Sequence, residues 1–183
     1  MTVPEDFLNT ATYPVVVDPT FGYTTQGGTN GAATDDFVGS EYTSPSDYSS
    51  LDSVHVRYVK GGSGTAFKTA ITNASLNYLT NGVSDGQVGV NGWNVATYTT
   101  PPTLAASTVY VLGALVSSAS GGGSVLYDTG GGASQGALDL SNSYASPTNP
   151  TDASRDDSLY SIYVTYTASS SFNPAFAHRR LLL

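Results

Sequence analysis

Apolar and polar residues alternate along much of this chain with the period of two that a half-buried β-strand requires. The clearest example lies in the first third of the chain, where Val54, Val56 and Tyr58 alternate with His55 and Arg57. A strand with this pattern turns its three apolar side chains into a core. The histidine and the arginine then lie on the outer face.

Two further segments carry strong strand patterns. Residues 158–167 alternate large apolar or aromatic side chains with mostly smaller polar ones. Residues 108–117 are apolar at consecutive positions, so we expect a central strand that is covered on both faces. The glycine-rich residues 61–64 predict a tight hairpin into a strand at 65–71.

Turn residues interrupt the chain about every ten residues, and no segment has the spacing of an amphipathic helix. We expect about nine short strands and an all-β, antiparallel sandwich or barrel. The remaining strand candidates lie at residues 13–18, 21–25, 37–43, 75–79, 93–98 and 124–129.

Composition supports this fold class and narrows the function. Only 11% of the residues are charged, against about 25% in ordinary domains, so Ser, Thr, Asn and Tyr must supply the polar surface. The net charge of −8 disfavours binding to nucleic acids and to anionic membranes.

There is no cysteine and no apolar run long enough to span a bilayer, so we expect neither disulfides nor a membrane span. Glu5 and Asp6 stand where a signal peptide needs basic residues, so we expect no export signal.

The strand residues resemble those of jelly-roll β-sandwich modules similar to carbohydrate-binding modules, which occur in phage structural proteins and prokaryotic surface proteins. The resemblance covers about residues 13–167, and it implies a jelly roll used for adhesion, decoration or glycan contact. The leading residues 13–25 resemble the run that introduces such modules in virion proteins. The matching positions are Phe67–Ile71, Gly92, Trp93, Leu104, Tyr110 and Tyr160–Tyr163.

The two ends differ from the body. We divide the chain into an N-terminal arm at 1–20 with a short strand, a sandwich at 21–167 and a C-terminal tail at 168–183. Residues 1–171 hold four basic and fourteen acidic groups, whereas the last twelve hold two arginines and no acid, so the net charge changes from −10 to +2. We expect both ends to contact neighbouring subunits, in preference to packing back on the chain's own sandwich. The residues in question are Tyr13, Val15, Val17, Phe172, Phe176, Arg179, Arg180, Leu181, Leu182 and Leu183.

No catalytic constellation stands out. Residues 132–136 spell G-x-S-x-G around Ser134, but this motif activates serine only on a strand-to-helix elbow, and no helix pattern follows. Glycoside hydrolysis needs two carboxylates, and Glu41 has no evident partner. We therefore expect a protein that is not an enzyme and that has no cofactor.

Calcium is the one ion that the sequence suggests. Asp152, Asp156 and Asp157 form the best candidate site, because calcium prefers oxygen ligands in loops. Aspartate is equally common as a turn former, and that interpretation is the more economical one.

The thirteen tyrosines offer rigid contact area for sugars or for protein partners. Tyr23, Tyr48, Tyr127 and Tyr144 lie near predicted loops and are the surface candidates. Trp93 begins a strand, and we interpret it as a core anchor in preference to a sugar platform.

These observations predict a non-catalytic structural protein of a virion, an extracellular filament or a surface layer, in a decoration, tail-fibre or protomer role. Its partners are then copies of itself or neighbouring subunits. The alternative is a carbohydrate-binding or adhesion module with loop tyrosines and calcium.

Overall fold

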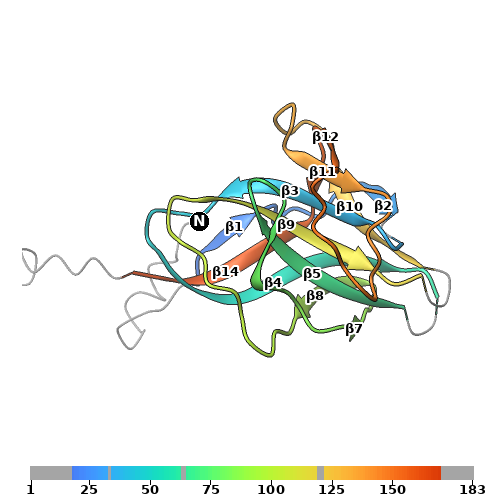
Figure 1. The fold of residues 1–183 in the computed structure, drawn as a ribbon, viewed down its shortest axis with the longest axis horizontal. Helices are drawn as coiled ribbons and strands as arrows, with labels where there is room; N and C mark the ends of the chain where they lie inside the picture. The colour runs from blue at the N-terminus through green and yellow to red at the C-terminus, as the bar shows by residue number, and fades with distance from the viewer. Residues whose placement is uncertain (1–17, 33, 63–64, 119–121, 170–183) are drawn as a thin grey trace, which may run out of the picture.

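Two antiparallel β-sheets pack face to face in the computed structural model (Figure 1), which describes residues 18–32, 34–62, 65–118 and 122–169. No helix occurs in these ranges. Sheet A contains β1 (Thr20–Gly22), β2 (Thr29–Ala32), β4 (Tyr48–Lys60), β8 (Gly92–Ala96), β10 (Gly123–Asp128), β13 (Leu159–Tyr160) and β14 (Ile162–Ala168). Sheet B contains β3 (Phe37–Thr43), β5 (Ala66–Asn73), β6 (Tyr78–Val83), β7 (Gln87–Val88), β9 (Val109–Val116), β11 (Gly136–Asp139) and β12 (Ser154–Asp156).

The core lies between the two sheets, and the period-two patterns build it. On β4, Val54, Val56 and Tyr58 are fully buried, while the residues between them point outward. Ile162 and Val164 of β14 pair with Val56 and Val54 and are buried in the same cluster. Each such side chain contributes about 1.5–3 kcal/mol when it is removed from water. The alternation predicted for both strands is confirmed.

Strand β9 is central and covered on both faces, as its continuous apolar pattern predicts. It pairs with β3 on one side and with β5 on the other. Leu112 faces the core between the sheets, and Val111 and Leu115 belong to a second cluster. That second cluster lies on the outer face of sheet B, where Tyr144 and Ala153 of the segment between β11 and β12 pack against it.

The closing strand is broken, which the sequence pattern did not predict. Ser161 separates β13 from β14 because its backbone bonds to two different strands. Its N–H donates to Leu126 O of β10 at 2.8 Å, and its carbonyl accepts from Arg57 N of β4 at 2.8 Å. The chain thus changes its partner strand at this residue. The described residues form fourteen strands against the expected nine, chiefly because β2, β7, β11 and β12 lie where turns or loops were expected.

The predicted hairpin at residues 61–64 is wrong. Strand β4 belongs to sheet A and β5 to sheet B, so the connection crosses from one sheet to the other. The glycines in this connection indicate a turn, but they do not specify which strands pair. The short strand expected at residues 13–18 falls almost entirely outside the described residues.

Candidate functional site

The outer face of sheet A carries a cluster of aromatic side chains that we call the aromatic face. It consists of Trp93 and Val95 from β8, His55 and Arg57 from β4, and Tyr163 from β14. Strand register brings them together, because Arg57 pairs with Trp93 and His55 pairs with both Val95 and Tyr163. On each of these strands the residues between these positions point into the core. All five side chains therefore lie on the solvent side of the sheet, where Val95 is 52% exposed.

The rings of this face contact one another directly. His55 stacks on Tyr163 with ring centroids 4.4 Å apart and planes within 3° of parallel. Trp93 meets the same tyrosine edge-on, at 5.0 Å and 69°. Burial lowers the pKa of His55, so the imidazole is neutral at pH 7. The result is a rigid, uncharged aromatic cluster with the Arg57 guanidinium beside it.

A serine lies next to this histidine, as in a nucleophile–base pair. Ser53 Oγ is 2.8 Å from His55 Nε2, and the same Oγ is 2.5 Å from Thr165 Oγ1. The three groups satisfy one another across β4 and β14. Within the described residues no carboxylate bonds to the imidazole to orient it as a base. We therefore interpret the three side chains as a hydrogen-bonded cross-strand cluster and not as a nucleophile–base pair.

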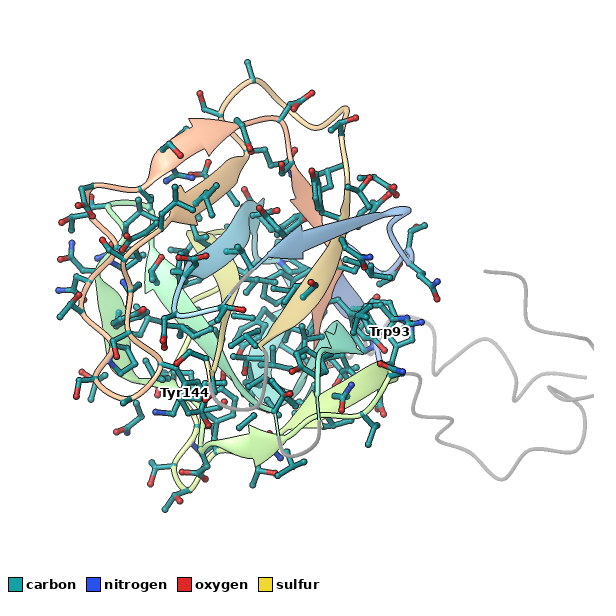
Figure 2. The ribbon with its side chains drawn as sticks, turned by 90° about the vertical axis from the view of Figure 1, so that its right-hand side faces the viewer. Trp93 and Tyr144 are labelled. Carbon is teal, nitrogen blue, oxygen red and sulfur yellow. The ribbon has the colours of Figure 1, made fainter. Side chains whose placement is uncertain are left out.

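The expectation that Trp93 anchors the core is wrong. Strand β8 turns Asn94 and Ala96 inward, so Trp93 points outward. Asn94 takes the inner position because its amide closes the preceding turn: Oδ1 accepts from Val90 N, and Nδ2 donates to the carbonyls of Val90 and Gly92. Figure 2 shows Trp93 at the surface, well apart from Tyr144.

A second site is a cleft where the two sheets separate at one end of the sandwich. We call it the tyrosine cleft, and its volume is about 230 Å³. Tyr127 and Tyr160, whose centroids are 5.3 Å apart, form one wall. Leu138 and Leu140 form the other, and Leu140 is 72% exposed. The remaining lining residues are small or polar: Asn30, Gly31, Asp156 and Ser158.

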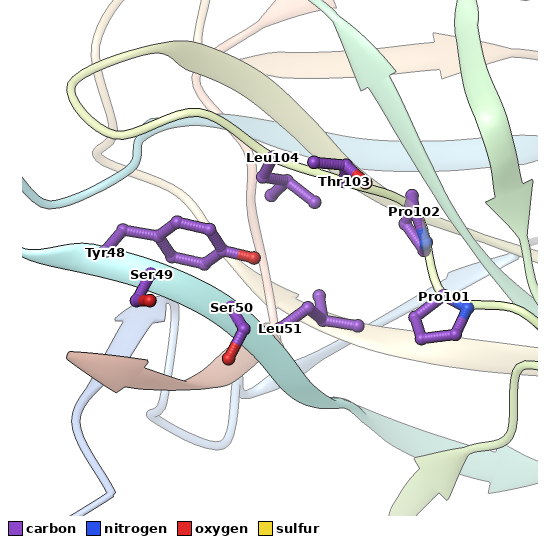
Figure 3. A pocket seen from close by; sticks show the side chains of 8 residues that line it. All are labelled: Tyr48, Ser49, Ser50, Leu51, Pro101, Pro102, Thr103 and Leu104. Carbon is purple, nitrogen blue, oxygen red and sulfur yellow. The ribbon is translucent and has the colours of Figure 1, made fainter. Parts of the chain in front are cut away.

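A third site is a groove of about 200 Å³ between the start of β4 and residues 101–104 (Figure 3). Tyr48 lines this groove, but only 6% of its surface is exposed, and its ring packs against Phe21 and Tyr166. Tyr48 was expected to offer surface for a ligand, and that expectation is wrong. The residue follows a Ser-Pro turn, yet its place in β4 turns it into the core.

The other surface tyrosines are half-buried and hold loops in place. The Tyr23 hydroxyl donates to Asp128 Oδ2 at 2.6 Å, and this hydrogen bond raises the pKa of Tyr23. Tyr144 lies beneath the Lys68 ammonium, 4.6 Å from its ring centroid. Its backbone N–H donates to Asp35 Oδ1. Among the four candidates, Tyr127 is the one that lines the tyrosine cleft.

The three aspartates of the calcium hypothesis do not gather at one point. Asp156 accepts hydrogen bonds from Ser158 N and Oγ, and Asp157 accepts one from Gly130 N. Across the described ranges, no three histidine, cysteine or acidic side chains form a group that could hold a metal ion. Calcium binding stays a prediction of the sequence alone.

Ser134 occupies an exposed turn before β11. Gln135 N donates to Gly132 O, and the Gln135 side chain accepts from Gly132 N, so the segment closes on itself. Arg155 reaches the Ser134 carbonyl at 3.4 Å. A β-strand follows the G-x-S-x-G segment, where a nucleophile elbow has a helix.

The residues expected to mediate assembly from the two ends lie outside the described ranges: Tyr13, Val15, Val17, Phe172, Phe176, Arg179, Arg180, Leu181, Leu182 and Leu183. The described part of the chain contains no helix with the length and apolarity that a bilayer crossing requires. Comparisons with protein-family models, with curated proteins and with solved structures find no match to this chain.

Proposed function

We propose that this protein is a non-catalytic structural module that binds neighbouring copies or subunits in a virion, an extracellular filament or a surface layer. The observation that supports the proposal is the aromatic face. Tryptophan, tyrosine and arginine are the residue types most enriched among the dominant contacts of protein interfaces. Here Trp93, Tyr163 and Arg57 are adjacent on one open sheet, with the exposed Val95 among them. The jelly-roll connectivity belongs to the same proposal.

The face is also prepared for binding at low entropic cost. Its side chains rise from paired strands of sheet A, and the stacking of His55 on Tyr163 already limits their rotation. Ordering a long side chain at an interface costs about 0.5–1.5 kcal/mol, and pre-ordered rings avoid part of that cost. A neutral histidine adds no charge that would have to be desolvated.

Sedimentation velocity of the full chain over a range of concentrations tests this function. We expect the wild type to self-associate, and Trp93→Ala to weaken the association at least about 30-fold, the effect of a dominant interface residue. Val88→Ala is the matched control, because Val88 is 65% exposed outside the aromatic face. A wild type that stays monomeric throughout would overturn the proposal.

Carbohydrate binding is the second candidate, and the orientation of Trp93 is the observation that favours it. An indole on an open sheet is a stacking surface for a sugar ring, and the hydroxyls of Ser53 and Thr165 lie on the same face. A glycan array and calorimetric titration, each with and without calcium, separate the two functions. Binding that Trp93→Ala abolishes would favour the glycan, and its absence throughout would favour assembly.

A further inference from the structure

The tyrosine cleft has the chemistry of a receptor for a segment that is both apolar and cationic. Its walls are apolar, and Leu140 is the most exposed of the large hydrophobic side chains described. Its polar rim includes the exposed carboxylate of Asp156. Tyrosine rings also attract a cation that lies over their faces. A neutral sugar would bring no positive charge to this carboxylate.

Negative charge at this cleft is not neutralised within the described residues. The one ion pair in the described residues joins Arg155 to Glu41, at 3.6 Å. Asp156 and Asp36 therefore have no cationic partner among these residues. Burial raises the pKa of Tyr160 to about 12, and the carboxylates of Asp156 and Asp36 act in the same direction. Asp156, which lines the cleft, and Asp36, which does not, therefore both add negative charge near Tyr160.

The chain's own C-terminal residues match this chemistry. Residues 172–183 contain Arg179 and Arg180, three consecutive leucines and no acid. Nine residues lie between Ser169, the last described residue, and Arg179, so the ten steps from one to the other can span at most about 35 Å. The segment thus combines the cation and the apolar side chains that the cleft would accommodate. The residues before it are long enough, when extended, to reach a neighbouring copy.

The cleft and the start of the tail lie at opposite ends of the sandwich. Tyr160 lines the cleft, and β14 then runs away from it to Ala168, over about 25 Å at the rise of an extended strand. Figure 1 shows β14, in red, ending on the side opposite β2, β10, β11 and β12. A contact between two different surfaces at opposite ends is heterologous, and such contacts build open filaments or rings.

We propose that residues 172–183 of one copy bind in the tyrosine cleft of the next, so that the protein assembles head to tail. Arg179 or Arg180 pairs with Asp156, and the leucines cover Leu138 and Leu140. This inference rests on the proposed function, because it names the contact by which copies join. It does not depend on the aromatic face, which is free to make a different contact.

Charge reversal on the tail and on the cleft, each in a full-length chain, tests the proposal. One variant carries Arg179→Glu with Arg180→Glu, and the other carries Asp156→Arg. We expect each alone to lose at least about tenfold in self-association by sedimentation velocity, and an equimolar mixture to regain it, because each altered tail then meets a complementary cleft. Asp152→Arg is the matched control, since Asp152 is exposed and does not line the cleft.

The fold of each variant is checked by circular dichroism, since Asp156 also bonds to Ser158. Asp156→Asn keeps an oxygen for that bond and removes only the charge, and we expect it to weaken association as well. If the wild type associates and neither charge variant changes it, the cleft proposal is wrong while the assembly function stands. If the single variants lose association and the mixture does not regain it, the tail does not bind the cleft of another copy. A wild type that never associates overturns both.

Discussion

The outer faces of the two sheets differ in what covers them. On sheet B, Val111 and Leu115 point outward from β9, and the segment between β11 and β12 covers their cluster through Tyr144. On sheet A, the described chain supplies no such cover over Trp93 and Tyr163. The described part of the chain thus covers one outer face and leaves the other open, and we propose that the open face makes the contacts of assembly.

The strongest contrast is expected from truncating one side chain on each face. Leu115→Ala removes a fully buried side chain and should cost about 2–5 kcal/mol of unfolding free energy. Trp93→Ala removes a partly buried side chain on the outer face and should cost less, about 1–2 kcal/mol. Urea unfolding followed by circular dichroism measures both. Equal costs would show that Trp93 supports the fold as Leu115 does.

The cover on sheet B can itself be loosened. Tyr144→Ala removes a ring that packs on the outer cluster and lies under Lys68, so we expect a loss of about 1–3 kcal/mol. Hydrogen exchange should then speed up at residues 140–153 before it does so elsewhere. Tyr144→Phe keeps the ring and serves as the control. Unchanged exchange in Tyr144→Ala would mean that other contacts hold the segment.

Acidification should weaken the open face. Burial lowers the pKa of His55, so the folded protein binds this proton less readily than the unfolded chain does. Its contribution to stability is present above the unfolded pKa of about 6.5 and declines as the pH falls through the folded value. We expect thermal stability to fall on acidification through this range, and His55→Gln to reduce the fall. An identical pH profile in the variant would contradict this assignment.

The smallest effect concerns Asp36, which directly precedes β3 of sheet B. Burial raises its pKa, and Asp139 and Asp35 add to the rise. A carboxyl group with a raised folded pKa stabilises the fold when protonated, and that benefit is lost as the pH rises through the folded value. Asp36→Asn should therefore raise the melting temperature at pH 7 and lose this advantage near pH 3. A variant that melts lower than the wild type at pH 7 would exclude this account.

The sequence was sufficient for the fold class but insufficient for the site. Alternation identified β4 and the closing strand, because burial on one face leaves a period-two signal, whereas a continuous apolar run identified β9 as a strand covered on both faces. It could not show that β8 lies beside β4, since pairing between distant strands depends on the whole packing. For that reason Trp93 was assigned to the core. The outward side chains of His55 and Tyr163 were the available signal for the aromatic face.

The tyrosine cleft was less accessible to sequence reasoning. Tyr127 and Asp156 were both singled out, one as a surface residue and the other as a calcium ligand. Nothing local links them, because β10 and β12 belong to different sheets. The break at Ser161, which places Tyr160 in the cleft, follows from bonds to two strands far away in the sequence.

The central claim is that the open face becomes buried when copies associate, and Trp93 can report on it directly because it is the only tryptophan in the chain. Tryptophan fluorescence and its quenching by acrylamide can be recorded while the protein concentration rises through the assembly range. The account predicts an emission shift to shorter wavelength and reduced quenching in step with association. Emission and quenching that stay unchanged while the protein assembles would contradict it.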